Sequence, residues 1–141
     1  LSNRYKHTHF KETALPSQLI PRPNGRLNRG DYYAAMQSCK IVLSLRGEGY
    51  DTFRFWENAA MNAVHVSQSM PLLIPNDFTH NVNIFKCENL NELIRNIDNI
   101  LDGDVDSETI IKQSHLHLER FHTTTKRAAY LLEELHKAFR R

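Results

Sequence analysis

The pattern of apolar and polar positions along residues 39–101 predicts an α/β protein. An apolar run at 41–45 is followed by a glycine-containing turn, a helical pattern at 53–61 and a second apolar run at 63–67. This order of strand, turn, helix and strand is typical of a βαβ unit, whose two strands are parallel. We therefore expect a parallel sheet with flanking helices.

The remaining elements follow from the same patterns. In chain order we expect a helix at 31–38, a loop at 68–81, a strand at 82–85, and helices at 89–101, 107–121 and 124–139. Asp31 is the expected cap of the helix at 31–38, and Asn89 with Glu92 forms a capping pair before the helix at 89–101. The two closing helices each have one apolar face, which we expect to pack on the sheet and on the other helix.

Residues 1–30 differ from the rest of the chain because they are basic and irregular. Six arginines and lysines stand against Glu12 alone, and three prolines and two glycines interrupt any periodic pattern. We interpret this segment as the truncated start of a single domain that occupies residues 31–141. Three strands make a thin sheet, so we expect further strands outside this chain.

Composition narrows the class of protein. The chain has 141 residues, enough for one domain with a core, and its 40% hydrophobic and 24% charged residues are ordinary for a globular protein. A net charge of +2 gives no support to binding of nucleic acid or a membrane surface, and no apolar run approaches the ~18 residues of a transmembrane helix. We interpret Cys39 and Cys87 as small buried hydrophobes in a reducing compartment rather than as a disulfide. We therefore expect a cytoplasmic protein, with membrane association only through other parts of the protein.

The turn after the first strand carries the residues with the clearest chemistry. Candidate binding residues in this turn and the helix after it are Arg46, Gly47, Gly49, Tyr50, Asp51, Thr52, Arg54 and Glu57. In open α/β sheets, ligands bind at loops beyond the carboxyl ends of strands. Glycines permit close approach and positive φ, arginines pair with phosphate oxygens, and a helix N-terminus capped by Asp51 or Thr52 favours an anion. A carboxylate behind such a turn suits ribose hydroxyls, so the segment favours a nucleotide.

Two interpretations of Glu57 stay open on spacing alone. The expected buried stripe of the helix at 53–61 is Phe53, Trp56 and Ala60. Glu57 and Arg54 then project on the side of the turn, where they either bind a ligand or form an ordinary exposed helix pair.

The segment SCKIVLSLRGEGYDTFRFWENAAMNAVHV resembles the donor-binding segment of exostosin-like and spore-maturation-type glycosyltransferases. PLLIPNDF at 71–78 and HTTTKRAAYLL at 122–132 are similar to the same families and occur in the same order. The resemblance implies a Rossmann-like domain, the C-terminal half of a GT-B glycosyltransferase of glycan or polysaccharide biosynthesis. It would transfer a sugar from a nucleoside-diphosphate sugar to a hydroxyl acceptor.

The resemblance also implies residue roles. Glu57 would hold the donor ribose, Arg54 would support the phosphates, and the diphosphate or donor sugar would face Arg46, Gly47 and residues 49–52. No metal cofactor would be needed. The general base and the acceptor site would belong to an N-terminal GT-B domain, so we expect the catalytic base outside this chain and no activity from the chain alone.

The chain departs from these families at several positions. Met61 and Asn62 stand where the families have a glycine, and His65 replaces a strand proline. Glu48 and Glu57 have eight residues between them, one more than the glutamate pair of retaining relatives. Whether the anomeric configuration is retained or inverted therefore stays open.

Other functions remain as alternatives. The first is a non-catalytic Rossmann-like module that binds nucleotides or regulates a partner. A response-regulator-like signalling domain is disfavoured because no acidic cluster ends the first strand. We interpret His115 and His117 as surface residues rather than metal ligands, since a spacing of two points them to different sides of a helix. For His122, at the junction of the last two helices, we expect a structural hydrogen bond.

Overall fold

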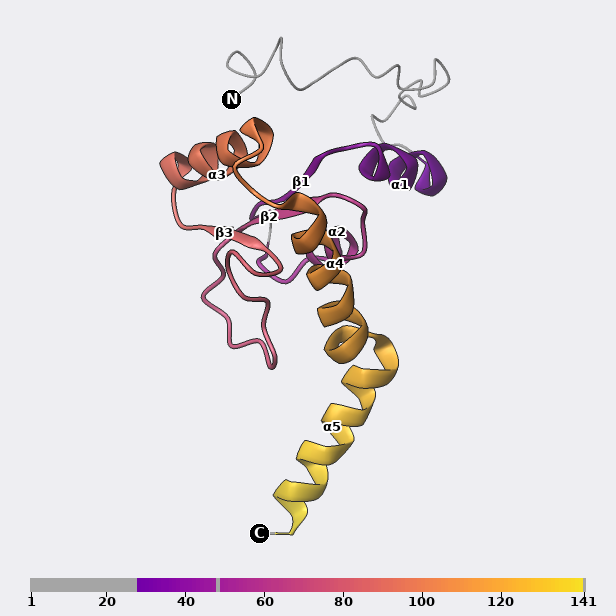
Figure 1. Ribbon diagram of the computed structural model, residues 1–141. Helices are drawn as coiled ribbons and strands as arrows, with labels where there is room; N and C mark the ends of the chain where they lie inside the picture. The colour runs from indigo at the N-terminus through magenta and orange to yellow at the C-terminus, as the bar shows by residue number, and fades with distance from the viewer. Residues whose placement is uncertain (1–27, 48, 141) are drawn as a thin grey trace.

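The computed structural model describes residues 28–47 and 49–140, which form an α/β fold around three parallel strands (Figure 1). In chain order the elements are α1 (Arg29–Gln37), β1 (Ile41–Ser44), α2 (Phe53–Ala59), β2 (Val64–Gln68), β3 (Phe85–Cys87), α3 (Leu90–Asp102), α4 (Ser107–His117), a π-helical turn (Leu118–His122) and α5 (Thr124–Phe139). The predicted fold class is confirmed. Most of the basic segment, residues 1–27, lies outside the described residues.

The central strand of the sheet is β2, which pairs in parallel with β1 on one side and β3 on the other. Because side chains alternate along a strand, β2 presents a different set of residues to each face. Val64 and Val66 belong to the core that also contains the inner face of α3. His65 points to the other face, where its ring lies 5.0 Å from the ring of Phe55 in α2. Helices therefore cover both faces of β2.

The sequence accounts well for α3. The side chain of Asn89 accepts a hydrogen bond from the backbone N–H of Glu92 at 3.0 Å, so the predicted capping pair is confirmed. Gly103 ends the helix with a φ of 85°, a left-handed conformation that favours glycine. The buried residues between these ends include Leu93, Ile97 and Ile100.

Two of the predicted elements begin at different residues in the structure. The first helix starts at Arg29, and the side chain of Asn28, rather than that of Asp31, caps it by accepting from the Asp31 backbone N–H at 2.9 Å. The third strand starts at Phe85 instead of residue 82, because a turn forms first and Val82 is exposed. The predicted loop after β2 is correspondingly longer.

The two closing helices behave differently. In α4, Ile110 and Ser114 are buried, and the Ser114 hydroxyl donates to the carbonyl of Ala59, the last residue of α2. In contrast, α5 buries no residue and extends away from the rest of the fold (Figure 1). The expectation that both helices pack on the sheet and on each other is therefore wrong for α5. Within the described ranges, no helix has both the length and the apolar content needed to cross a membrane.

The two cysteines are free thiols in different environments. Cys87 is buried in β3, as expected, and burial raises the pKa of its thiol. Cys39, just before β1, is exposed, so the expectation that both are buried is wrong for Cys39. Cys39 follows the C-cap of α1, and its thiol donates to the carbonyl of Ala35 in that helix at 3.2 Å.

Candidate functional site

The candidate site lies at the carboxyl edge of the sheet, where the loop after β1 meets the end of β2. The backbone N–H of Arg46 donates to the side-chain oxygen of Gln68 at 3.2 Å, which ties the loop to β2. The guanidinium of Arg46 donates to the hydroxyl of Tyr50 at 3.3 Å and lies 4.8 Å from the centre of the Tyr50 ring. In the described part of the chain, Arg46 forms no ion pair. Among the described residues, its charge therefore has no acidic partner.

Open space lies beside the two glycines of this loop. A Cβ added at Gly47 or Gly49 would meet no atom within 4 Å, and Gly47 does not have the positive φ that the sequence suggested. Internal packing therefore does not explain glycine at these positions. The free space allows a ligand to approach the backbone closely. Glu48, between them, lies outside the described residues.

The helix that follows, α2, turns a different face to the core than the sequence predicted. Its buried residues are Phe55, Asn58 and Ala59. The predicted stripe of Phe53, Trp56 and Ala60 is wrong, since Phe53 is 89% exposed and Ala60 lies past the end of the helix. The inner face is set by Phe55, whose ring packs against the rings of His65 and Phe78.

Glu57 is half-buried between α2 and α1, where two tyrosines bind its carboxylate. The hydroxyl of Tyr33 donates to Oε1 at 2.6 Å, and that of Tyr32 donates to Oε2 at 3.4 Å. Burial raises the pKa of Tyr32; the nearby Arg54 opposes this shift and the charge of Glu57 adds to it. No ion pair joins Arg54 to Glu57 within the described residues. The exposed helix pair, one of the two interpretations of the sequence, is therefore not formed.

The start of α2 is not capped as predicted. Thr52 occupies the N-cap position, but its side chain makes no capping hydrogen bond. The carboxylate of Asp51 instead accepts a hydrogen bond from the indole N–H of Trp56 at 2.7 Å. Asp51 therefore holds the Trp56 ring in place, and both residues line a pocket.

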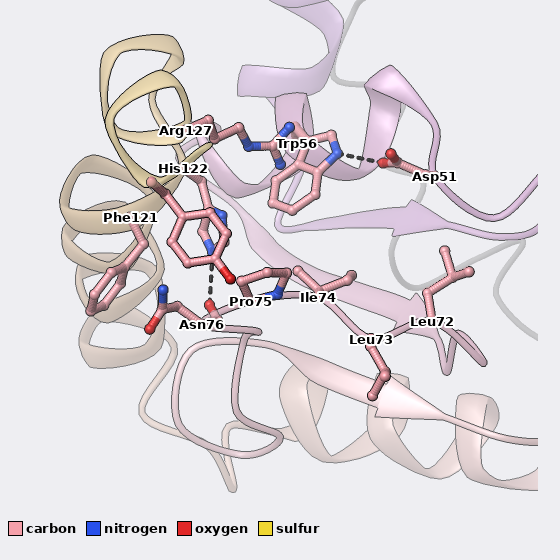
Figure 2. Close-up of a pocket in the computed structure, with 11 residues that line it drawn as sticks. Asp51, Trp56, Leu72, Leu73, Ile74, Pro75, Asn76, Phe121, His122 and Arg127 are labelled. Atoms are coloured by element: carbon pink, nitrogen blue, oxygen red, sulfur yellow. Dashed lines mark hydrogen bonds between the residues drawn. The ribbon is translucent and has the colours of Figure 1, made fainter. Parts of the chain in front are cut away.

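This pocket has a volume of about 350 Å³ and opens beside Trp56 (Figure 2). Its walls come from α2 and the loop before it, the loop after β2, the π-helical turn and the first part of α5. Residues that line it include Asp51, Trp56, Pro75, His122, Arg127 and Tyr130. The guanidinium carbon of Arg127 lies 3.7 Å from the centre of the Trp56 ring, so α5 reaches across to α2 at this point.

The π-helical turn places α5 against the pocket. Each π-helical turn contains about one residue more than an α-helical turn, and such turns are frequent at functional sites. Thr123 then has an extended conformation and caps α5 by accepting from the Lys126 backbone N–H at 3.3 Å. Arg127 follows within the first turn of α5.

Three histidines bind backbone carbonyls around this turn. The Nε2 atoms of His117 and His122 donate to the carbonyl of Asn76 at 2.7 and 2.8 Å, and that of His115 donates to Met61 at 2.9 Å. Burial lowers the pKa of His122. The structural role predicted for His122 is confirmed, whereas His115 and His117 are half-buried rather than surface residues. No group of three potential metal ligands occurs in the described residues.

Comparison with known families agrees with the fold. The model of the family described as glycosyl transferase-like matches residues 7–133. The chain belongs to this glycosyl transferase-like family. No curated protein and no solved structure matches the chain. The matched range contains the loop after β1, Glu57 and the pocket, so this glycosyltransferase domain includes the whole candidate site.

The structure brings together residues that the sequence left apart. It joins Arg46 to Tyr50 and Asp51 to Trp56, but it places Glu57 against α1 rather than in the pocket. The sequence patterns did not point to four of the site residues, namely Tyr32, Tyr33, Trp56 and Arg127. The similarity of residues 122–132 to known families was the one signal that pointed to Arg127.

Proposed function

We propose that this domain binds the nucleotide-sugar donor of a glycosyltransferase, with Glu57 holding the ribose. The observation that carries the proposal is the half-buried Glu57 carboxylate, whose described partners are two neutral hydroxyl groups. A carboxylate accepts two hydrogen bonds at once, and vicinal ribose hydroxyls offer the same donors as Tyr32 and Tyr33. A ribose can therefore join or replace the tyrosines without leaving Glu57 unpaired.

The diphosphate of the donor would lie on the loop after β1. Arg46 has no acidic partner in the described chain, and the backbone at Gly47 and Gly49 is open to close approach. Arg54 is exposed in the first turn of α2, the helix that directly follows this loop, and its charge acts on Tyr32 of α1. As the donor bond breaks, negative charge develops on the leaving diphosphate, and fixed donors and cations stabilise it electrostatically. We propose that these arginines serve in place of a metal ion.

We further propose that the domain is the C-terminal half of a GT-B enzyme of the exostosin-like or spore-maturation type, in the cytoplasm. A second, N-terminal domain would supply the general base and bind a glycan or another hydroxyl acceptor. The thin sheet supports this proposal, and so does the uncovered apolar face of α5. Its residues Leu131, Leu132, Leu135 and Phe139 are 43–86% exposed. A second domain could cover them.

Substitution Glu57→Gln tests the ribose contact. Hydrogen bonds to a charged group contribute about 1.5–3 kcal/mol, so we expect nucleoside diphosphates to bind about tenfold to a hundredfold more weakly. Calorimetric or NMR titration with UDP, GDP and ADP measures this in the 141-residue chain. Glu108→Gln, at an exposed glutamate of α4, is the matched control and should bind as the wild type.

Three comparisons make the test specific. The diphosphate should bind more tightly than its nucleoside, and binding should survive a chelator. A 2′,3′-dideoxy nucleotide should bind the wild type weakly and lose little more in Glu57→Gln, since the same contact is already absent. Unchanged affinity of the Gln variant, equal affinity for nucleoside and diphosphate, or loss of binding with the chelator would each contradict the proposal.

A further inference from the structure

The pocket beside Trp56 has a second kind of chemistry, separate from Glu57. One wall is aliphatic and comes from the loop after β2, with Leu72, Leu73, Ile74 and Pro75. The facing wall is aromatic and contains Trp56, Phe121 and Tyr130. Figure 2 shows Pro75 and Ile74 beneath the Trp56 ring. A ligand of this pocket must therefore present apolar surface to most of its surroundings.

Two charged groups contact the Trp56 ring, one at its edge and the other over its face. The carboxylate of Asp51 binds the indole N–H and keeps further acceptor positions free. The guanidinium of Arg127 stacks over the ring, and stacking uses none of its N–H donors. Neither residue forms an ion pair within the described chain. The pocket thus combines apolar walls with one strong hydrogen-bond acceptor, Asp51, and one strong donor, Arg127.

The charges decide which ligand fits. Asp51 and Arg127 carry opposite charges, and burial lowers the pKa of His122, which favours its neutral form. An anion would gain from Arg127 but would be repelled by Asp51. A purely apolar ligand would desolvate both charged groups without giving them partners, which is costly. A neutral ring with hydroxyl groups avoids both problems, because hydroxyls donate to Asp51 and accept from Arg127.

We propose that this pocket is a saccharide subsite that binds one pyranose ring, with its C–H face on the aromatic and aliphatic walls and its hydroxyls on Asp51 and Arg127. The volume of about 350 Å³ is in the range of small-molecule sites. The sugar could belong to the donor or to the acceptor. That assignment rests on the proposed function, whereas binding of a free pyranoside does not.

Trp56 gives a direct measurement because it is the single tryptophan of the sequence. The 141-residue chain is titrated with the methyl pyranosides of glucose, galactose, mannose and N-acetylglucosamine, and Trp56 emission and saturation-transfer NMR of the sugar protons are recorded. We expect at least one pyranoside to bind at millimolar concentration. Arg127→Met keeps an unbranched apolar side chain but removes the donors, and Asp51→Asn removes the charge; each should weaken binding about tenfold or more.

Arg120→Met is the matched control. Arg120 lies in the same turn, 4.9 Å from the ring of Phe121, but does not line the pocket. Its substitution should leave pyranoside binding unchanged. Circular dichroism of each variant confirms folding before the comparison. If none of the four pyranosides gives emission changes or saturation transfer, or if Arg127→Met and Asp51→Asn bind like the wild type, the proposal is overturned.

Nucleotide titrations distinguish the two sources of sugar. If the subsite holds the donor sugar, UDP-glucose or GDP-mannose should displace the pyranoside while UDP or GDP should not. If it holds an acceptor sugar, pyranoside and nucleotide sugar should bind together. Both results support the subsite. Nucleoside-diphosphate binding that depends on Glu57, without any pyranoside binding, would overturn the subsite and leave the proposed function intact. Pyranoside binding without nucleotide binding would contradict the proposed function and leave the subsite intact.

Discussion

Helices α3 and α5 are both amphipathic, yet one belongs to the core and the other does not. In α3, Leu93 is 4% and Ile97 is 8% exposed, and both pack with the strands β2 and β3. In α5, Leu131 and Leu132 are 59% and 58% exposed, and no residue of the helix is buried. An apolar stripe predicts that a helix has a face to cover, but it does not identify what covers that face.

The connections explain the difference. Only Glu88 and Asn89 separate β3 from α3, so the chain turns back and lays the helix on the sheet. Before α5, the chain passes through the π-helical turn and the extended Thr123, and α5 then continues away from the sheet (Figure 1). Arg127 still touches the body through Trp56, but the apolar face beyond it does not. The path of the chain, rather than the pattern, decides which helix is buried.

The largest expected effect comes from α3. Leu93→Ala should lower the free energy of unfolding by about 2–5 kcal/mol, because it removes a buried side chain and leaves a cavity. Urea unfolding followed by circular dichroism measures the change. Leu90→Ala in the same helix is the control, since Leu90 is 58% exposed, and it should cost less than about 0.5 kcal/mol. Equal effects at the two positions would show that α3 does not form the core.

The second effect concerns the other face of the sheet. His65 is buried, neither ring nitrogen has a hydrogen-bond partner in the described residues, and burial lowers its pKa to about 3. The folded protein therefore keeps His65 neutral while the unfolded chain protonates it near pH 6.5. Stability is unaffected above pH 6.5 and falls progressively as the pH drops toward 3. The expected loss at pH 4 is about 3 kcal/mol, at 1.36 kcal/mol per unit of pKa shift.

Substitution His65→Leu isolates the contribution of His65 to the pH dependence of stability. It should be neutral or stabilising at pH 7.5, because it removes two unpaired buried polar atoms, and its advantage over the wild type should grow as the pH falls to 4. His136→Gln on the exposed face of α5 is the control and should leave the pH dependence of unfolding unchanged. If wild type and His65→Leu lose stability in parallel between pH 7.5 and 4, His65 is solvated in the native state.

These contrasts also show how far the sequence predicts the molecule. The order of elements, the parallel sheet and the Asn89 cap follow from local signals, because hydrophobic periodicity and capping depend on neighbouring residues. The inner face of α2 does not follow from such local signals. This helix has only seven residues, too few for the periodic pattern to show whether Phe55 or Trp56 is the buried residue.

The site depends on contacts that no local pattern records. Glu57 meets tyrosines 24 and 25 residues earlier, and Arg127 stacks on Trp56 from a distant helix. The long loop after β2 supplies the aliphatic wall of the pocket without any regular spacing. The sequence could therefore predict where a ligand would bind along the sheet edge, but not the partners of Glu57 or the existence of the pocket.

The smallest expected effect is the sharpest test of the comparison, because it uses the same substitution as the largest. Leu132→Ala on α5 should cost less than about 0.5 kcal/mol in this chain, whereas packing of α5 on the sheet would have made it as costly as Leu93→Ala. The same urea experiment measures both variants, at two protein concentrations.

A loss above 2 kcal/mol for Leu132→Ala would mean that the apolar face of α5 is covered in solution. A dependence of this loss on protein concentration would identify a second copy of the chain as the cover. A small loss in both would leave the face free for another domain. Hydrogen exchange of the α5 amides should then slow when that domain is supplied, since covering the apolar face suppresses local opening of the helix.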